Sequence, residues 1–215
     1  MANINMAQYL ENTEVEGPGK RFAIWVQGCQ RHCPGCCNPQ FLGFVPRTII
    51  DTAKVCSFIE ESKHCNGIEG VTFLGGEPIL QAKGLSEIAH FCHDIGLSVM
   101  VFTGYTHEEI LREKLPYADE LLQYTDLLVD GVFDRAKPET KRNWVGSTNQ
   151  RFHFITDFYK SGIEYDERFS HGFELRIDSD GTLQTNGFPW QDVATTRMSH
   201  IQQKHSGGTN GSDDF

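Results

Sequence analysis

Three cysteines have the spacing of ligands for an iron-sulfur cluster. Cys29, Cys33 and Cys36 form a C-x3-C-x2-C pattern within the run QGCQRHCPGC. Such clusters are held by cysteine thiolates, and Pro34 and Gly35 suit a short loop that approaches a cluster closely. A cubane cluster held by three thiolates keeps one iron open. A small molecule, substrate or cofactor, is expected to bind that iron.

The other four cysteines do not offer a second set of ligands. Cys37 directly follows Cys36 and is expected to point away from the site that Cys36 faces. Cys56 and Cys92 are expected to be small buried residues in helices, and Cys65 is expected to be an incidental surface thiol. The cluster loop is therefore the only tight cysteine motif in the sequence.

Strand-like and helix-like patterns alternate after the cysteines. Short apolar runs predict strands at residues 22–26, 71–74, 98–102, 127–129 and 151–155. Helices are predicted at residues 51–61, 85–95 and 106–115, the last with a capping box formed by Thr106 and Glu109. Strands that alternate with helices predict a mostly parallel sheet with right-handed crossovers. The loops that follow these strands should then share one edge of the sheet.

The last third of the chain departs from this alternation. Residues 173–177 and 182–185 flank Ser179-Asp180-Gly181, which predicts an antiparallel hairpin. From about Gln191 the sequence is polar and is expected to be disordered. The fold is thus predicted as α/β, a partial, open β/α barrel of mostly parallel strands with a C-terminal β-hairpin extension, in one domain over residues 1–190 with a tail at 191–215.

Composition narrows the classes of function. The chain has 215 residues, with 19 Lys plus Arg against 29 Asp plus Glu, which gives a net charge of −10. Nucleic-acid binding requires a basic field that this chain lacks. The odd number of cysteines, 7, fits a reducing cytosol better than a secretory disulfide framework. Neither a leader-like segment at Met1 to Leu10 nor an apolar span is found, so a soluble, cytoplasmic protein is expected, with no membrane partner.

Taken in order over roughly residues 5 to 156, the motifs resemble those of the radical S-adenosylmethionine (SAM) enzymes. Within that family they resemble the small activating enzymes of anaerobic ribonucleotide reductase. The resemblance is carried by Glu16-Gly17-Pro18-Gly19, the cysteine loop with Asn38-Pro39, Gly75-Gly76-Glu77-Pro78, Val129-Asp130-Gly131 and Gly146-Ser147-Thr148-Asn149-Gln150-Arg151. The C-x3-C-x2-C pattern followed by Gly-Gly-Glu-Pro is the most specific part.

The resemblance implies the cofactors. Cys29, Cys33 and Cys36 would hold a [4Fe-4S] cluster, and SAM would bind the open iron through its amino nitrogen and carboxylate. Reductive cleavage of SAM then gives methionine and a 5′-deoxyadenosyl radical that abstracts a hydrogen atom. The protein supplies orientation and exclusion of water, so no catalytic residue is assigned beyond the cluster.

Further residues are expected to bind SAM. The turn Gly75, Gly76, Glu77, Pro78 follows a predicted strand, and in the resembling family it binds the methionine amino group; an ordinary strand-to-helix turn would use the same residue types. Thr103 and Asp130 end two more strands, and Asp130 is suited either to a ribose or ammonium group or to an Asx turn. Near the methionine carboxylate, the resemblance places Ser147, Asn149 and Arg151. An ordinary polar turn is the alternative interpretation of these three residues.

Three functions follow from these observations. The first is an activase that makes a glycyl radical on a partner, the large subunit of anaerobic ribonucleotide reductase, with a one-electron donor such as flavodoxin or ferredoxin. The second is a radical SAM enzyme that modifies a peptide or small molecule. The third is a non-catalytic zinc-binding interaction module, in which His32 or His64 completes a tetrahedral site with the three cysteines.

Overall fold

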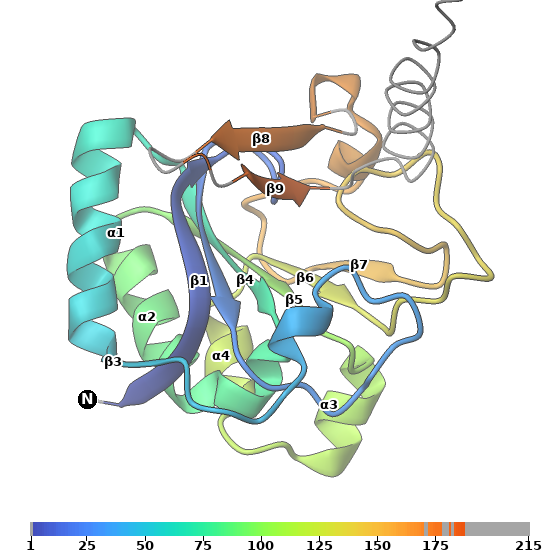
Figure 1. Cartoon of the computed structure of the whole chain (residues 1–215), viewed down its shortest axis with the longest axis horizontal. Coiled ribbons are helices and arrows are strands. Elements are labelled where there is room, and N and C mark those ends of the chain that lie inside the picture. The colour runs from blue at the N-terminus through green and yellow to red at the C-terminus, as the bar shows by residue number, and fades with distance from the viewer. Residues whose placement is uncertain (1, 170–171, 178–180, 182, 188–215) are drawn as a thin grey trace, which may run out of the picture.

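A mixed sheet of seven strands forms the centre of the protein, as the computed structural model shows (Figure 1). The structure describes residues 2–169, 172–177, 181 and 183–187. The strands lie in the order β3-β1-β2-β4-β5-β6-β7. Their bounds are β1 Asn3–Thr13, β2 Arg21–Val26, β3 Thr48–Asp51, β4 Gly70–Gly75, β5 Ser98–Phe102, β6 Leu127–Asp130 and β7 Arg151–Phe154.

The middle of the sheet is parallel and its edges are antiparallel. The pairs β2-β4, β4-β5 and β5-β6 are parallel, whereas β1 pairs antiparallel with β2 and β3, and β7 with β6. This confirms the predicted α/β fold with a mostly parallel central sheet. Strand β7 runs against β6 because residues 131–150 return the chain to the sheet without a helical crossover.

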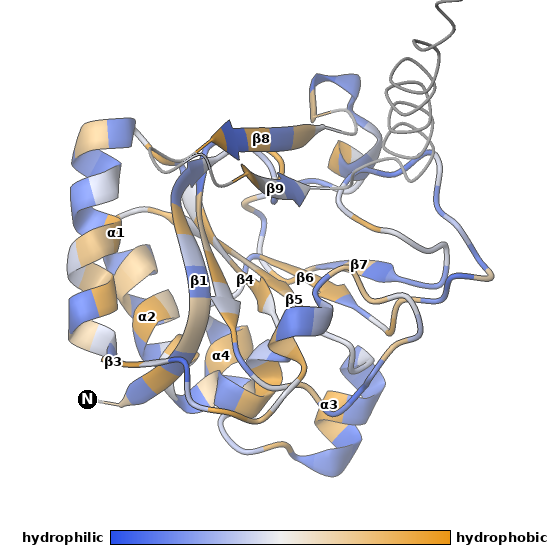
Figure 2. Cartoon of the chain, viewed as in Figure 1, coloured by the Kyte–Doolittle hydropathy of each residue, from blue (hydrophilic) through white to orange (hydrophobic). Residues whose placement is uncertain are grey.

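Helices α1 Thr52–Asn66, α2 Ala82–Asp94 and α4 Ala118–Gln123 lie together on one face of the sheet (Figure 1). The largest hydrophobic core lies between these helices and the sheet, and it includes fully buried Phe22, Phe73 and Leu85. Figure 2 shows hydrophobic residues concentrated along the central strands. In the part of the chain that the structure describes, no helix is long and apolar enough to cross a membrane.

The shorter helices mark the loops between strands. Helix α3 His107–Glu113 begins with the predicted capping box, in which Thr106 and Glu109 bond reciprocally. Single-turn 3-10 helices occur at η1 Pro39–Phe41, η2 Pro78–Gln81, η3 Ile163–Tyr165 and η4 Glu167–Phe169. Gly67 caps helix α1 directly after Asn66, and its left-handed φ of 65° suits a glycine.

Strands β8 Phe173–Ile177 and β9 Leu183–Gly187 pair antiparallel and lie across the end of the sheet where β1 ends (Figure 1). Most of the predicted turn Ser179-Asp180-Gly181 and the whole of the predicted tail 191–215 lie outside the described residues. Contacts with the chain between β1 and β2 hold this pair of strands. The Glu16 carboxylate accepts hydrogen bonds from Gly187 N at 2.8 Å and from the Asn186 amide at 3.4 Å.

A buried arginine joins the same end of the sheet to the loops that cover it. Arg21 is fully buried, and its guanidinium donates to Thr72 Oγ1 at 2.6 Å and to Val71 O at 2.6 Å. It also donates to the Tyr159 hydroxyl at 2.9 Å, which lies 2.6 Å from Ser98 Oγ. Because a buried guanidinium must have its donors satisfied, this network fixes the segment around Tyr159 against the sheet.

Replacing Tyr159 by Phe is expected to lower the free energy of unfolding by about 1 to 2 kcal/mol. The change removes one hydroxyl, so Arg21 and Ser98 each lose one of their hydrogen-bond partners. Denaturant unfolding measures the loss. Tyr165→Phe is the matched control, since Tyr165 is 57% exposed and its change should stay within about 0.5 kcal/mol. Equal effects of the two substitutions would contradict a stabilising role of the Tyr159 hydroxyl in this network.

Burial raises the pKa of Glu16 to about 7, although hydrogen bonds from Gly187 and Asn186 oppose that rise and the nearby Glu174 adds to it. An acid with a higher pKa in the folded state binds its proton more tightly when folded. Its contribution to stability is therefore fully present below the unfolded pKa and is lost as the pH rises toward 7.

We expect Glu16→Gln to be more stable than the wild type at pH 8, by about 1 to 3 kcal/mol, and to match it near pH 4. Glutamine keeps the oxygen that accepts from Gly187 and Asn186 and removes the buried charge. Unfolding measured at both pH values tests this. The exposed neighbour Glu14, changed to Gln, is the control. A stability difference that does not vary with pH would count against a raised pKa at Glu16.

Candidate functional site

The candidate site lies where the four central strands end. Because β2, β4, β5 and β6 are parallel, their carboxyl ends meet at one edge of the sheet. The segments at these ends are the cysteine loop after β2, Gly75-Gly76-Glu77-Pro78 at the end of β4, Thr103-Gly104-Tyr105 after β5 and Asp130-Gly131 at the end of β6. The fold therefore brings four separate motifs of the sequence together.

The cysteine loop is closed by backbone hydrogen bonds at its base. Cys29 N donates to Leu42 O at 3.0 Å, and Cys36 N donates to Cys33 O at 3.0 Å. Cys29 is buried, whereas Cys33 and Cys36 are partly exposed. Two backbone amides donate to cysteine sulfurs. Arg31 N donates to Cys29 Sγ and Asn38 N to Cys36 Sγ, each at 3.4 Å. Such bonds stabilise cysteine sulfurs as cluster ligands.

The surroundings of the thiols differ. Burial raises the pKa of Cys29 and of Cys33, and the charge of Arg31 opposes the rise at Cys33. A hydrogen bond with the Cys37 thiol lowers the pKa of Cys36 to about 6. Cys37 is exposed, and its thiol lies beside that of Cys36.

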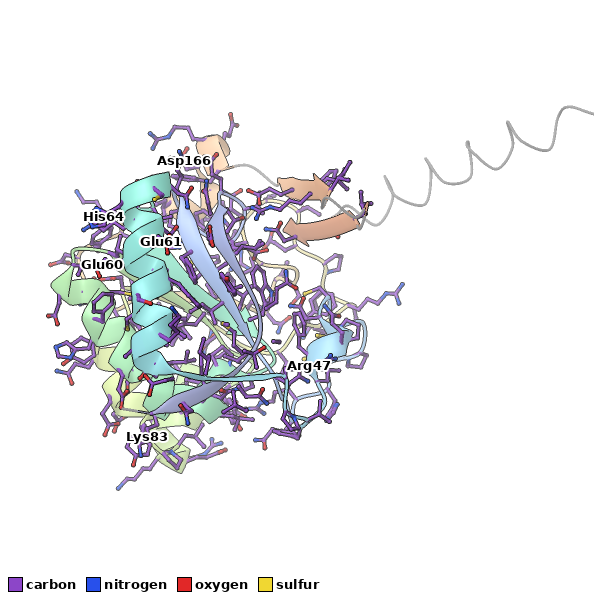
Figure 3. The ribbon with its side chains drawn as sticks, turned by 60° about the vertical axis from the view of Figure 1, so that its left-hand side comes forward. Arg47, Glu60, Glu61, His64, Lys83 and Asp166 are labelled. Atoms are coloured by element: carbon purple, nitrogen blue, oxygen red, sulfur yellow. The ribbon has the colours of Figure 1, made fainter. Side chains whose placement is uncertain are left out.

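The donor set fits a cluster better than a single ion. Among the described residues, no three or more His, Cys, Asp or Glu side chains lie close enough to hold one metal ion. Thiolates are the ligands that iron-sulfur clusters prefer, and each cysteine of a cubane binds a different iron. His64 lies on α1 beside Glu60 and Glu61, on the other side of the molecule from Arg47, which follows the cysteine loop (Figure 3). It is not placed to complete a zinc site with the cysteines.

The Gly75-Gly76 turn packs directly on the start of the cysteine loop. Gly76 N donates to Val26 O at 2.7 Å, and Glu77 N donates to Gly28 O at 2.9 Å. A Cβ on Gly76 would lie 2.4 Å from Gly28 O, and one on Gly75 would lie 2.5 Å from Val26 N. Gly75 also has a φ of 110°, which L side chains rarely adopt. The glycines are thus needed for the contact between the two loops.

Glu77 links this turn to the loop after β5. Its side chain is buried and accepts from Thr103 Oγ1 at 2.7 Å, Gly104 N at 2.8 Å and Ile79 N at 3.0 Å. Burial raises the pKa of Glu77, and these hydrogen bonds limit the rise. Pro78 begins η2 directly afterwards. Glu77 and Thr103 are therefore bonded to each other, and both position loops.

Asp130 is the centre of a charged group at the end of β6. It is fully buried, and Arg151 donates to its two oxygens at 3.0 and 2.6 Å. His107 N donates to it at 2.7 Å, and His153 Nε2 lies 2.9 Å from the same oxygen. Burial alone would raise the pKa of Asp130, but the bonds from Arg151 and His107 outweigh it and lower that pKa. Arg151 also pairs with Glu108.

Sequence reasoning missed the histidines of this group. Arg151 and His153 lie two residues apart in a strand, so they point to the same face, and this spacing was the available signal. His107, by contrast, joins through its backbone amide and through ring contact with His153, at 4.9 Å between centroids. No pattern in the sequence shows that contact.

The remaining predicted residues hold the loop between β6 and β7. Ser147 is fully buried, and its hydroxyl accepts from Asp134 N at 3.1 Å. Asn149 donates to Val132 O at 2.7 Å, while its Oδ1 is buried and has no hydrogen-bond partner among the described residues. Ser147 thus serves the fold of the loop, and Asn149 keeps one acceptor available.

Comparison with known proteins identifies the family. The model for the 4Fe-4S single cluster domain matches residues 15–153. The anaerobic ribonucleoside-triphosphate reductase-activating protein of Pasteurella multocida is 30% identical over 163 residues, which cover 72% of this chain and 100% of that protein. The protein of the same name from Enterobacteria phage T4 is 31% identical, with 66% of this chain and 89% of that protein covered. The chain belongs to the family of these activating proteins.

The family assignment confirms the resemblance that the motifs indicate, and with it an iron-sulfur enzyme of the activating-protein type. Among solved structures, QueE from Escherichia coli matches with a TM-score of 0.37 and 18% identity, over 49% of this chain and 54% of that one. That match is too weak to add to the assignment.

Changing any one of Cys29, Cys33 or Cys36 to Ala is expected to abolish cluster assembly, because three thiolates are the smallest set that holds this cluster. Iron and sulfide content after anaerobic reconstitution measures the loss. The matched controls are Cys37→Ala, Cys56→Ala and Cys92→Ala, which should keep four irons per chain. A Cys37→Ala protein unable to hold four irons would overturn the assignment of ligands.

Proposed function

We propose that this activating protein is a radical SAM activase. It cleaves SAM reductively at a [4Fe-4S] cluster and forms a glycyl radical on its partner, the large subunit of anaerobic ribonucleotide reductase. The names of its relatives and the 4Fe-4S family model support this function. The single observation that carries it is the backbone contact between the three-cysteine loop and the Gly75-Gly76 turn at the carboxyl edge of the sheet.

When bound, the two cofactors supply an electron and a 5′-deoxyadenosyl group that removes a hydrogen atom. The residues of the protein bind these two cofactors and hold them next to each other. Cys29, Cys33 and Cys36 hold the cluster, and the turn from Gly75 to Pro78 presents its backbone to SAM beside them. Glu77 keeps Thr103 next to that turn.

The loop after β6 and strand β7 form the other side of the proposed SAM site. Asp130 orients Arg151 there through two hydrogen bonds. Ser147 holds the loop that carries Asn149, whose Oδ1 has no hydrogen-bond partner among the described residues. We assign Arg151 and Asn149 to the methionine end of SAM, with Asp130 behind Arg151.

The shape of the sheet suits a protein substrate. Strands β3 and β7 stand at opposite edges, and the described strands show no pairing between them. We therefore interpret the fold as a partial, open barrel with β8 and β9 as its hairpin extension. An open side would let a loop of the partner reach SAM. Glycine is the favoured target, because its α-carbon radical is stabilised by the flanking amide groups and has no side chain in the way.

The proposal includes a cytoplasmic location and a soluble one-electron donor such as flavodoxin or ferredoxin. The seven cysteines are all free thiols, as a reducing compartment allows. The net charge of −10 gives no support to a nucleic-acid partner.

Reconstituted protein, incubated anaerobically with dithionite, SAM and the co-encoded reductase, is expected to give a glycyl-radical doublet in electron paramagnetic resonance and 5′-deoxyadenosine in the product mixture. The matched controls are Cys33→Ala in this chain and a Gly→Ala change at the radical site of the reductase. The first should abolish both signals, and the second only the doublet. Formation of 5′-deoxyadenosine without any doublet would replace this function by modification of a peptide or small molecule.

A further inference from the structure

Two residues between the first two cysteines reach out of the cysteine loop. The Arg31 guanidinium lies over the Tyr105 ring, 3.8 Å from its centroid, and Arg31 Nη2 donates to Glu109 Oε2 at 2.7 Å. The Gln30 amide bonds to the Tyr105 hydroxyl. The Arg31 and Glu109 side chains are only 22% and 26% exposed. The segment from Cys29 to Cys33 is thus attached to the loop after β5 and to helix α3.

Tyr105 and Glu109, which contact the Arg31 side chain, are themselves held in place by other hydrogen bonds. Tyr105 is 2% exposed, and its carbonyl accepts from Gly131 N at 3.1 Å. The Glu109 carboxylate also accepts from Thr106 N at 2.8 Å within the capping box of α3. Arg31 therefore bonds to a prearranged partner, so ordering its side chain costs less than at a mobile surface pair.

The stem of Arg31 packs as closely as its head group. A Cβ on Gly104 would lie 2.9 Å from Arg31 Cγ, so the loop after β5 is shaped to accept this side chain. Gly104 N in turn donates to Glu77. Arg31 thereby joins the cysteine loop to the same unit of loops that Glu77 holds together.

An ordinary surface salt bridge is the plain alternative, and it contributes about 0 to 1 kcal/mol. Three observations separate Arg31 from that case: the stacking on a buried ring, the partial burial of both charges and the tight fit on Gly104. A planar guanidinium is suited to stack and pair at once, whereas a lysine ammonium is not.

We propose that Arg31 is a positioning residue for the cluster. It fastens the Cys29 to Cys33 segment to Tyr105 and Glu109, and it fixes a positive charge on the loop that carries the cluster ligands. A cluster gains one negative charge on reduction. A positive charge fixed on the cysteine loop therefore makes reduction easier. This inference rests on the proposed function only in that it requires the cluster, and it concerns residues outside the ligand set.

The test measures the midpoint potential of the reconstituted cluster by a redox titration followed with electron paramagnetic resonance, without SAM or reductase. Arg31→Gln is expected to hold four irons and to have a more negative potential than the wild type. Arg31→Lys keeps the charge and loses the stack, so a smaller shift in the same direction is expected. Arg112→Gln on α3, where the Arg112 side chain is 68% exposed, is the control and should leave the potential unchanged.

An Arg31→Gln potential equal to that of the wild type would overturn the proposal, and so would an equal shift in Arg112→Gln. If Arg31→Gln fails to load iron, Arg31→Lys decides in its place, and an unchanged potential there overturns the inference. Because no partner is present, the result is separate from the test of function. A normal glycyl doublet with no shift in potential would keep the proposed activase and reject the role of Arg31.

Discussion

The site depends on one backbone contact, the pair of hydrogen bonds that joins the Gly75-Gly76 turn to the residues just before Cys29. Gly76 N donates to Val26 O and Glu77 N donates to Gly28 O, with no room for a Cβ between the two segments. The parallel pairing of β2 and β4 brings the two loops to the same edge, and the glycines let them touch. A side chain at Gly76 would separate the cysteine loop from the turn proposed to bind SAM.

The buried charged residues form two separate networks, one at each end of the parallel strands. At the carboxyl edge of the parallel strands, Glu77 and Asp130 are bound by donors from neighbouring loops, so each loop is fixed by the next. At the opposite end, Arg21 satisfies its donors on strand carbonyls and hydroxyls, and Glu16 holds strand β9. The second network stabilises the scaffold, and the first shapes the site. Buried charge of this kind is tolerated because Glu77, Asp130, Arg21 and Glu16 each have hydrogen-bond partners.

The sequence predicted strands β2, β4, β5, β6 and β7 closely and missed β1 and β3. Strand β5 matches the predicted residues 98–102, because a short, fully buried apolar run has few other interpretations. Strand β1, Asn3–Thr13, and the short β3 were missed: β1 is rich in Asn, Gln and Glu, and its burial alternates. The motifs gave the residues of the site, and the parallel order gave their common edge. The bonds that occupy Glu77, Asp130 and Arg31 join residues 20 or more positions apart, and no local pattern predicts such pairs.

These bonds change how the acidic residues of the motifs should be interpreted. A carboxylate next to a ligand site suggests direct contact with the ligand, yet Glu77 accepts three hydrogen bonds from protein and Asp130 is held by Arg151, His107 and His153. Both carboxylates therefore serve first to fix the loops. Recognition of SAM would then fall mainly to backbone groups of the glycine turn and to acceptors such as Asn149 Oδ1. Because backbone atoms cannot change rotamer, a site built this way is ordered before its ligand arrives, and binding costs less conformational entropy.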